Sequence, residues 1–361
     1  GASASSLGEI REAAVAEMEG ALASALAAPE PDPLDDSRIV FARAPADGRA
    51  AAVAPSGAGT MIAAARSALA AVMEADESVM ILGEDVAAGG PFGLTRDLAE
   101  VHGSERVRNT PISEGAVMGV AVGLALAGRK PLVDLMFDDF LTLASDQLFN
   151  HAAKIHFMSG GARSVPLCVW TTGGAGTRWG AQHSQRMDGW IASVPGLKVL
   201  APTTPAMAAA SLAAGIEDPD PVVVLADRTL LYKRWTLPND DASPWRNRLV
   251  RSGSELTVAA SGRTVLLALE ALDELGLEAD VVDLQRIAPL DTSEVAASLA
   301  RTSRLLVAHD EARGGGLADR VVREIAASDA FWDLDAPIEV VTAPTTPIPA
   351  GPALEDAYSV T

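Results

Sequence analysis

A glutamate that opens an apolar helix is the first residue of this sequence whose setting suggests chemistry. Glu114 directly precedes Gly115, in a segment where Gly119 and Gly123 follow at intervals of four residues. A carboxylate in the first turn of a helix can simply complement the helix dipole. Burial among apolar groups would instead raise its affinity for a proton, which makes Glu114 a candidate acid. The residues alone leave both interpretations open.

The three glycines share one face of this expected helix, because they lie about one turn apart. Each costs about 1 kcal/mol of helix propensity relative to alanine, so a compensating contact is expected. Glycines at this spacing allow two helix backbones to approach closely. The pattern therefore favours a close crossing with another helix, in another subunit, over an accident of the surface.

A second candidate is His183, which lies in the glycine-rich loop 171–185 after an apolar run at 165–170. Imidazole titrates near neutrality and suits acid–base work. Such a loop lets a ligand approach the backbone, although this one lacks the Gly-Lys-Ser/Thr signature of a phosphate loop. A functional histidine and a structural or solvated one both remain open.

The remaining cysteine and histidine pattern argues against further chemistry. Cys168 is the single cysteine and lies in an apolar run, which favours a buried structural thiol over a nucleophile. A chain without disulfide partners indicates a reducing compartment, so a cytoplasmic location is expected. Cysteine pairs and His-x-x-x-His spacings are absent from the sequence, so no dedicated zinc site is expected.

The elements that would position Glu114 and His183 alternate between helix and strand. After a helix at 63–73, the strands expected of a first domain lie at 79–82, 131–135, 165–170, 198–201 and 221–226. A second set has strands at 256–260, 279–284, 305–308 and 338–342, with helices at 264–275, 292–300 and 317–327. Short apolar strands separated by helices predict an α/β fold of two doubly wound domains, whose parallel strands bind ligands at their carboxyl ends.

The N-terminal part of the chain has a different texture. Apolar residues at helical spacing predict an amphipathic helix over 7–27, whose apolar face needs a partner. Prolines within 28–33 end this helix, and a connector rich in Ala, Gly, Pro and Ser spans 44–60. The first domain boundary is expected in that connector.

The composition excludes several classes of protein. A chain of 361 residues that is 48% hydrophobic has enough apolar content for two or three folded domains, which excludes wholesale disorder. Its formal charge of −20 would repel a phosphate backbone, so nucleic acid is not an expected partner. The longest uncharged apolar stretch, 115–128, is shorter than the roughly 20 residues that span a bilayer, and no export signal is recognisable. Neither a membrane nor secretion is expected.

Nine short blocks stand in a distinctive order: Gly83-Glu84-Asp85-Val86, Glu105-Arg106-Val107, Thr110-Pro111-Ile112-Ser113-Glu114, Asp146-Gln147, Met158-Ser159-Gly160-Gly161, Ala181-Gln182-His183-Ser184-Gln185, Pro195-Gly196-Leu197-Lys198-Val199, Pro289-Leu290-Asp291-Thr292 and Pro347-Ile348-Pro349. With them the chain resembles the beta subunit of the thiamine-diphosphate-dependent first component of 2-oxo acid dehydrogenase complexes, a relative of the two later domains of transketolase. The resemblance implies a pyrimidine-binding domain at 61–240 and a smaller transketolase C-terminal-like domain at 253–361.

The resemblance also implies roles for particular residues. Glu114 would contact the aminopyrimidine ring nitrogen of thiamine diphosphate, where a shared proton activates the cofactor as a carbon nucleophile. Phe140, which by itself reads as core, would stack on the pyrimidine, with Ile112 and Met136 as lesser contacts. His183 would lie near the substrate and assist acyl transfer to a lipoyl group.

A potassium ion is a further implication of the resemblance. Backbone carbonyls near Leu167, Gly215 and Ile216 would hold it, with Asp218 and Asp220 nearby. The sequence departs from the family here, since Asp220 stands where an asparagine is common. This departure weakens the expectation of a potassium site.

Half of the family's active site has no counterpart in this sequence. The Gly-Asp-Gly segment and Asn-Asn pair that bind the diphosphate and magnesium are absent. An alpha-like partner, in a heterotetramer, is therefore expected to supply them. Residues 1–36 resemble the terminal helix and tail of an alpha subunit, with 37–60 as a linker, which indicates a fused, split or cleaved alpha–beta architecture.

The expected activity is decarboxylation of a 2-oxo acid with transfer of the acyl group to a lipoyl-bearing partner. A transketolase-like or acetoin-cleaving reaction is the alternative, in which a two-carbon unit passes to a lipoyl or carrier-protein thiol. The Arg178-Trp179 pair and Ala116 depart from the family and leave the substrate open. A non-catalytic scaffold is the alternative of another class, and retention of Glu114, Phe140 and His183 argues against it.

Overall fold

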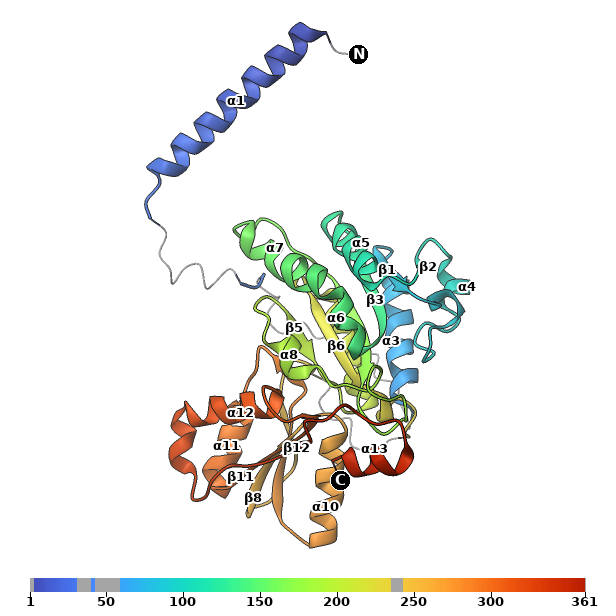
Figure 1. Cartoon of the computed structure of the whole chain (residues 1–361), viewed down its shortest axis with the longest axis vertical. Coiled ribbons are helices and arrows are strands. Elements are labelled where there is room, and N and C mark those ends of the chain that lie inside the picture. The colour runs from blue at the N-terminus through green and yellow to red at the C-terminus, as the bar shows by residue number, and fades with distance from the viewer. Residues whose placement is uncertain (1–2, 31–39, 43–58, 235–242, 361) are drawn as a thin grey trace. The chain divides into compact units, whose positions relative to one another are not determined.

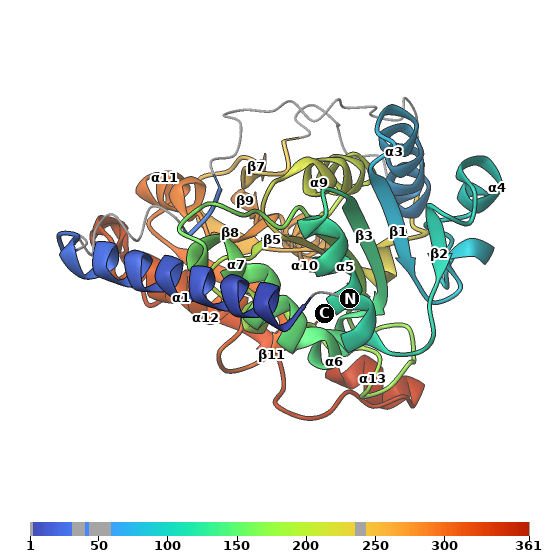
Figure 2. The same cartoon turned by 90° about the horizontal axis from the view of Figure 1, so that it is seen from above.

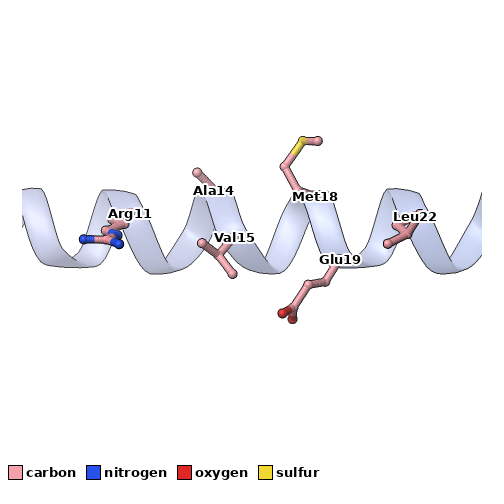
Figure 3. Close-up of a pocket in the computed structure, with 6 residues that line it drawn as sticks. All are labelled: Arg11, Ala14, Val15, Met18, Glu19 and Leu22. Atoms are coloured by element: carbon pink, nitrogen blue, oxygen red, sulfur yellow. The ribbon is translucent and has the colours of Figure 1, made fainter.

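The computed structural model describes residues 3–30, 40–42, 59–234 and 243–360, in two compact units divided at residues 39 and 40 (Figure 1). A helix is confirmed in the N-terminal part as α1 (Ala4–Ala27), whose cap Ser3 accepts a hydrogen bond from the Ser6 N–H. The prediction that it is amphipathic is wrong, because its apolar residues, alanines included, do not gather on one face. No residue of α1 is buried, and Figure 3 shows a hollow on its surface lined by side chains of this one helix. Most of the predicted tail and linker, including 43–58, lies outside the described residues.

Parallel strands form the first sheet of the second unit, as expected. Its order is β10-β5-β6-β4-β3-β1-β2, and of the described strands in this sheet only β10 runs antiparallel to its neighbour. The strands are β1 (Val79–Gly83), β2 (Val107–Asn109), β3 (Lys130–Phe137), β4 (Cys168–Gly173), β5 (Lys198–Leu200), β6 (Val222–Asp227) and β10 (Arg286–Ala288). The prediction that β4 begins at 165 is wrong, because Pro166 has no N–H to donate and pairing starts at Cys168.

Helices cover both faces of this sheet (Figure 2). On one face α3 (Met61–Ala75) packs against α9 (Pro205–Glu217), and Thr60 caps α3. The other face carries α5 (Glu114–Leu126), α6 (Leu141–Ser145), the π-helical η4 (Asp146–Ala152) and α7 (Ala153–Met158). Burial on both faces explains why the strands read as continuous apolar runs rather than as alternating patterns.

Short helices connect these elements. They are η2 (Val86–Ala88), α4 (Leu98–His102), η3 (Asp138–Phe140), α8 (Asp188–Ala192) and η5 (Arg228–Leu230). Two of them, η3 and η5, directly follow β3 and β6. Their residues therefore lie at the carboxyl edge of the sheet, where ligands bind in folds of this type.

The second sheet has the order β12-β11-β8-β9-β7 and includes one strand that was not expected. Its strands are β7 (Arg248–Arg251), β8 (Leu256–Ala260), β9 (Ala279–Asp283), β11 (Leu305–Ala312) and β12 (Glu339–Ala343). Its helices are α10 (Arg263–Leu275), α11 (Ser293–Thr302), α12 (Leu317–Ala326), η6 (Asp329–Asp333) and α13 (Pro352–Tyr358). Because β7 pairs with β9, this sheet begins before residue 253, where the sequence places the start of the domain.

One apolar core joins the two sheets. Val199 and Ala201 of the first domain cluster with Ile287, Val282 and Leu305. The strand β10, contributed by the later part of the chain, pairs with β5 at the edge of the first sheet. The first domain therefore depends on the second for part of its sheet and core. Within the described part of the chain, none of the helices combines the length and apolarity needed to cross a bilayer.

A buried acid in β3 makes stability depend on pH. Asp134 accepts a hydrogen bond from the Met136 N–H (3.2 Å), yet burial raises the pKa of Asp134 to about 7. Between about pH 4 and 7 the folded state binds the proton that the unfolded state has lost, so this group makes stability fall as pH rises. Asp134→Asn removes that penalty, so its advantage in unfolding free energy over wild type should increase by about 3 kcal/mol from pH 5 to pH 8.

Urea unfolding of both proteins at pH 5, 6, 7 and 8 measures the difference in unfolding free energy. Asp97→Asn is the matched control, because Asp97 is exposed and its φ of 69° is one that asparagine tolerates. The difference should grow with pH for Asp134→Asn and stay flat for Asp97→Asn. A flat profile for both variants would show that Asp134 is ionised without penalty.

Candidate active site

An aromatic cluster lies at the carboxyl edge of the first sheet. Phe137 ends β3, and its ring centroid lies 4.9 Å from that of His183 and 5.2 Å from that of Phe140. The His183 and Phe140 rings are 5.5 Å apart in an edge-to-face arrangement. Trp179 packs on Phe137 at 5.3 Å. Two residues singled out in the sequence, Phe140 and His183, are thus brought together from segments more than forty positions apart.

The backbone turn at the end of β3 sets the direction of the Phe137 and Phe140 rings. Met136 has a φ of +66°, and the pairing of β3 with β4 shifts register between Asp134 and Phe137. A non-glycine residue in this region is costly, and two hydrogen bonds hold it here. The Thr172 hydroxyl donates to the Met136 carbonyl (2.7 Å), and the Met136 N–H donates to Asp134. Met136 therefore lies at the site as expected, as a residue that shapes the turn.

Two buried acids between the phenylalanines were not anticipated. Asp139 accepts a hydrogen bond from Gln185 Nε2 (2.7 Å), whereas neither carboxyl oxygen of Asp138 has a partner among the described residues. Burial raises the pKa of Asp138 well above its usual range. A side chain on Gly173 would place its Cβ 2.1 Å from Asp138 Oδ2, so only glycine fits at the end of β4. The sequence signal that could have found them is the pair of acids flanked by two phenylalanines at 137–140, directly after an apolar strand.

Arg228 is the other unanticipated member of this region. Its guanidinium carbon lies 5.2 Å from the centroid of the Phe137 ring and 5.7 Å from that of Trp179. Its Nη2 donates to the Gly174 carbonyl (2.9 Å). Arg228 therefore links the end of β6 to the aromatic cluster and to the loop after β4.

Glu114 begins α5 and is half-buried. Glu84, which follows β1, lies close enough that burial and the charge of Glu114 raise the pKa of Glu84. Because β1 and β3 are parallel neighbours, Glu114 and Phe140 lie at the same edge of the sheet. Ile112, which also precedes α5, is 81% exposed in this chain.

The glycine face of α5 is approached closely from within the chain. A Cβ on Gly115 would lie 3.3 Å from the Leu143 carbonyl, and one on Gly119 would lie 3.2 Å from Gln147 Oε1. These contacts are to α6 and η4 of the same chain, and a crossing with a helix of another subunit stays a prediction. Gly123 has no neighbour within 4 Å, and Val120 is 55% exposed. One side of α5 therefore remains an open apolar surface.

A buried charge network joins the two domains behind this site. Arg186 donates to both oxygens of Asp188 (2.7 and 2.9 Å) and lies 3.8 Å from Asp227 and from Asp310. His309 Nε2 lies 3.6 Å from Asp188. Burial favours the protonated form of Asp188, but Arg186 and His309 outweigh it and lower its pKa below the usual range. One arginine thus balances acids from β6, α8 and β11.

The residues expected around a potassium ion are close together, but a lysine ammonium is already among them. Lys198 Nζ lies 2.7 Å from Asp218 Oδ1 and 2.9 Å from Asp220 Oδ2. The Leu167 carbonyl accepts a hydrogen bond from the Val222 N–H (2.9 Å), while Gly215 and Ile216 are buried in α9. Lys198 balances only one of the two carboxylate charges, so charge alone does not exclude a cation here, and the potassium site stays a prediction.

The single cysteine and the possible metal ligands were the other groups considered in the sequence. Cys168 is buried at the start of β4, and burial raises the pKa of its thiol, in agreement with a structural role. Among the residues that the structure describes, no group of three or more His, Cys, Asp or Glu could hold a metal ion.

Comparison with known proteins identifies the family. Residues 58–233 match the family described as "Transketolase, pyrimidine binding domain", and residues 246–361 match "Transketolase, C-terminal domain". The beta subunit of acetoin:2,6-dichlorophenolindophenol oxidoreductase from Bacillus subtilis is 39% identical over 317 residues, which cover 83% of this chain and 92% of that protein. The beta subunit of the mitochondrial pyruvate dehydrogenase E1 component from Saccharomyces cerevisiae is 36% identical over 307 residues, covering 82% and 84%.

A solved structure shares the fold. A split-gene transketolase, described as an inactive beta4 tetramer, aligns with a TM-score of 0.65 and 23% identity over 84% of this chain and 94% of that one. It supports the α/β architecture of two transketolase-type domains. With the family matches and the identities above, the chain belongs to the family of E1 beta subunits of thiamine-diphosphate-dependent 2-oxo acid dehydrogenases.

Proposed function

We propose that this chain forms one half of an active site that takes a 2-oxo acid, removes its carboxyl group as carbon dioxide and passes the acyl group to a lipoyl-bearing partner. The observation that carries the proposal is the placement of Glu114, Phe140 and His183 at one edge of one sheet. An acid beside an aromatic wall fits the aminopyrimidine end of thiamine diphosphate. An alpha-like partner, in a heterotetramer, would supply the ligands for the diphosphate and magnesium.

Thiamine diphosphate, when bound, supplies a carbon nucleophile and an electron sink for decarboxylation. Glu114 would hold a proton at the pyrimidine ring nitrogen. Glu114 is half-buried at the start of α5, beside the open side of this helix that a partner would cover. Phe140 would support the ring from one side, and Met136 would line the same turn. Ile112, exposed here, would meet the cofactor only when the partner docks.

His183 would transfer a proton during acyl transfer. Its ring meets Phe137 and Phe140 edge to face, which orients the imidazole and limits the water around it. The group that receives the acyl unit would be the disulfide of a lipoyl domain, which is also the oxidant: its S–S bond breaks as the new C–S bond forms. Imidazolium can protonate the sulfur that is released, and neutral imidazole can accept the hydroxyl proton as the acyl carbonyl forms. A carrier-protein thiol could receive the acyl group only from a lipoyl thioester formed in this way.

Acetoin is the second donor to consider, because the Bacillus subtilis relative named for acetoin is 39% identical, against 36% for the yeast pyruvate dehydrogenase subunit. Cleavage of acetoin would yield the same two-carbon unit without loss of carbon dioxide. The aromatic cluster favours neither donor, since Trp179 and Phe137 would contact an alkyl group of either. The donor has to be decided by assay.

Reconstitution tests the proposal. The chain would be combined with an alpha-like subunit, thiamine diphosphate and Mg²⁺, then offered pyruvate, branched-chain 2-oxo acids, acetoin and a ketose phosphate. Release of carbon dioxide from a 2-oxo acid with acylation of a lipoyl domain is the expected result. Aldehyde release from acetoin without carbon dioxide would identify the acetoin-cleaving alternative. Cofactor-independent assembly with no turnover of any donor would favour a scaffold.

A further inference from the structure

The loop that carries Trp179 and His183 has an unusual backbone. Gly174, Gly176 and Gly180 have φ values of +102°, +105° and +75°, and Arg178 between them has a φ of +68°. Glycine populates this region freely, but it also loses the most conformational entropy on ordering. Arginine reaches the region only at a cost. Such a loop needs contacts from outside to keep one conformation.

A carboxylate from the C-terminal domain supplies these contacts. Glu355 lies on α13, is fully buried and accepts hydrogen bonds from the Gly176 N–H (2.8 Å) and the Arg178 N–H (3.1 Å). The same carboxylate pairs with the Arg178 guanidinium at 2.8 Å. Each of these bonds has a charged acceptor, and such bonds are about twice as strong as neutral ones. One side chain thus holds two loop amides and the strained arginine.

The neighbouring loop residues are held in the same way. Arg263 of α10 donates from Nη1 to the Ala175 carbonyl (3.2 Å), and Ala175 packs in a small buried cluster with Ile348 and Tyr358. The Gly174 carbonyl accepts from Arg228. Gly174, Ala175, Gly176 and Arg178 therefore all bond to fixed groups, and most of those groups belong to the C-terminal domain. The dark red α13 of Figure 1 is the element that completes this set.

From this arrangement we infer that Glu355 is a positioning residue for the active site. By fixing the backbone from 176 to 178, it sets where Trp179 and His183 meet Phe137. The inference rests on the proposed function insofar as His183 and Trp179 face the substrate. It assigns the C-terminal domain a part in ordering the substrate loop, besides completing the first sheet.

We call the hydrogen bonds of Glu355 to Gly176 and Arg178 the clamp. Proteolysis of the full chain tests the clamp without any assay of turnover. Trypsin cleaves after arginine, and the bond between Arg178 and Trp179 lies within the clamped segment. Glu355→Ala should be cut there at least about tenfold faster than wild type, because the loop opens more often.

Asp356→Ala is the matched control: Asp356 is 67% exposed and pairs with the same guanidinium at 2.6 Å, but holds no loop amide. Asp356→Ala should change the rate of cleavage after Arg178 by less than about threefold. Equal cleavage of wild type and Glu355→Ala would overturn the inference.

Kinetics of the reconstituted complex separate positioning from loss of folded protein. Unfolding a fraction of the enzyme lowers kcat and leaves KM unchanged, whereas a misplaced loop raises KM as well. Glu355→Ala should lower kcat/KM by about 10- to 100-fold with at least a roughly fivefold rise in KM. Glu355→Gln should lose less of kcat/KM than Glu355→Ala, since its amide oxygen can still accept a hydrogen bond from the Gly176 N–H.

An unchanged KM in Glu355→Ala would contradict the positioning role. If the wild-type complex turns over none of the donors, the proposed function fails, while the cleavage rates still decide whether the clamp exists.

Discussion

Glu114→Gln should abolish turnover in the reconstituted complex, lowering kcat by about 10³-fold or more, while fold and assembly persist. Glutamine has nearly the shape of glutamate but cannot share a proton with a ring nitrogen in the same way. Groups placed against developing charge in a dry site commonly contribute 10²- to 10³-fold each. The measurement is steady-state turnover of the preferred donor, with circular dichroism and gel filtration to check fold and assembly.

Glu294→Gln is the matched control for Glu114→Gln. Glu294 also lies in the first turn of a helix, α11, and is also half-buried. If Glu114 only complements a helix dipole, both variants should lose about 0.3 to 1 kcal/mol of stability and keep their activity. Turnover near the wild-type rate in Glu114→Gln would remove the acid from the mechanism and favour the scaffold. Loss in Glu114→Gln alone supports the cofactor role.

Arg186→Met should destabilise the chain by about 3 to 5 kcal/mol. Arg186 is buried and is hydrogen-bonded to Asp188, with Asp227 and Asp310 at 3.8 Å. Methionine fills much of the same volume but removes both hydrogen bonds to Asp188 and one cation from the cluster. Arg263 stays paired with Asp310 at 3.0 Å and His309 lies 3.6 Å from Asp188. Breaking a buried ion pair by removing one partner typically costs this much, because an uncompensated charge stays in a low-dielectric interior. Urea unfolding at pH 7 gives the change in unfolding free energy.

The control for this prediction is Arg108→Met. Arg108 pairs with Glu105 at 3.1 Å on the surface, and exposed pairs contribute about 0 to 1 kcal/mol. The same chemical change should therefore cost much less at 108 than at 186. Equal losses at the two positions would mean that the acids around Arg186 are protonated or hydrated, and that the network does not hold the two domains together.

The strands show where local pattern is a reliable guide to this fold. Apolar runs such as 79–82 and 256–260 correspond closely to β1 and β8, because a strand buried on both faces has few polar residues. Strands β2 and β10 have three residues each and contain arginine, so neither shows a period or an apolar run. The equally short β5 was predicted because its apolar run continues to Ala201. The edge strand β7 reads Arg-Leu-Val-Arg and is half-buried throughout, so its composition resembles that of a polar connector. Pro166 moved the start of β4, as its missing N–H requires.

The site residues divide along a similar line. Glu114 and His183 were predicted from their settings and from two short blocks that resemble the family, and Phe140 from its matching position in the family; their roles remain proposals. Glu355 and Arg178 carry no comparable local signal, since they are 177 positions apart and meet only when α13 folds over the loop. Asp138 and Arg186 likewise matter because they are buried, and burial cannot be predicted from the neighbouring residues in the sequence.

By itself the sequence determined the class of the fold, the order of most helices and strands, and the edge of the sheet where chemistry should occur. These properties follow from periodicity and from the bonding needs of the backbone, which act over a few residues. Only the tertiary structure decided which glycines of α5 pack within the chain, that Lys198 pairs with both Asp218 and Asp220, and that Glu355 holds the substrate loop. Charge pairing and close packing depend on distances between segments far apart in the chain, and those distances exist only after folding.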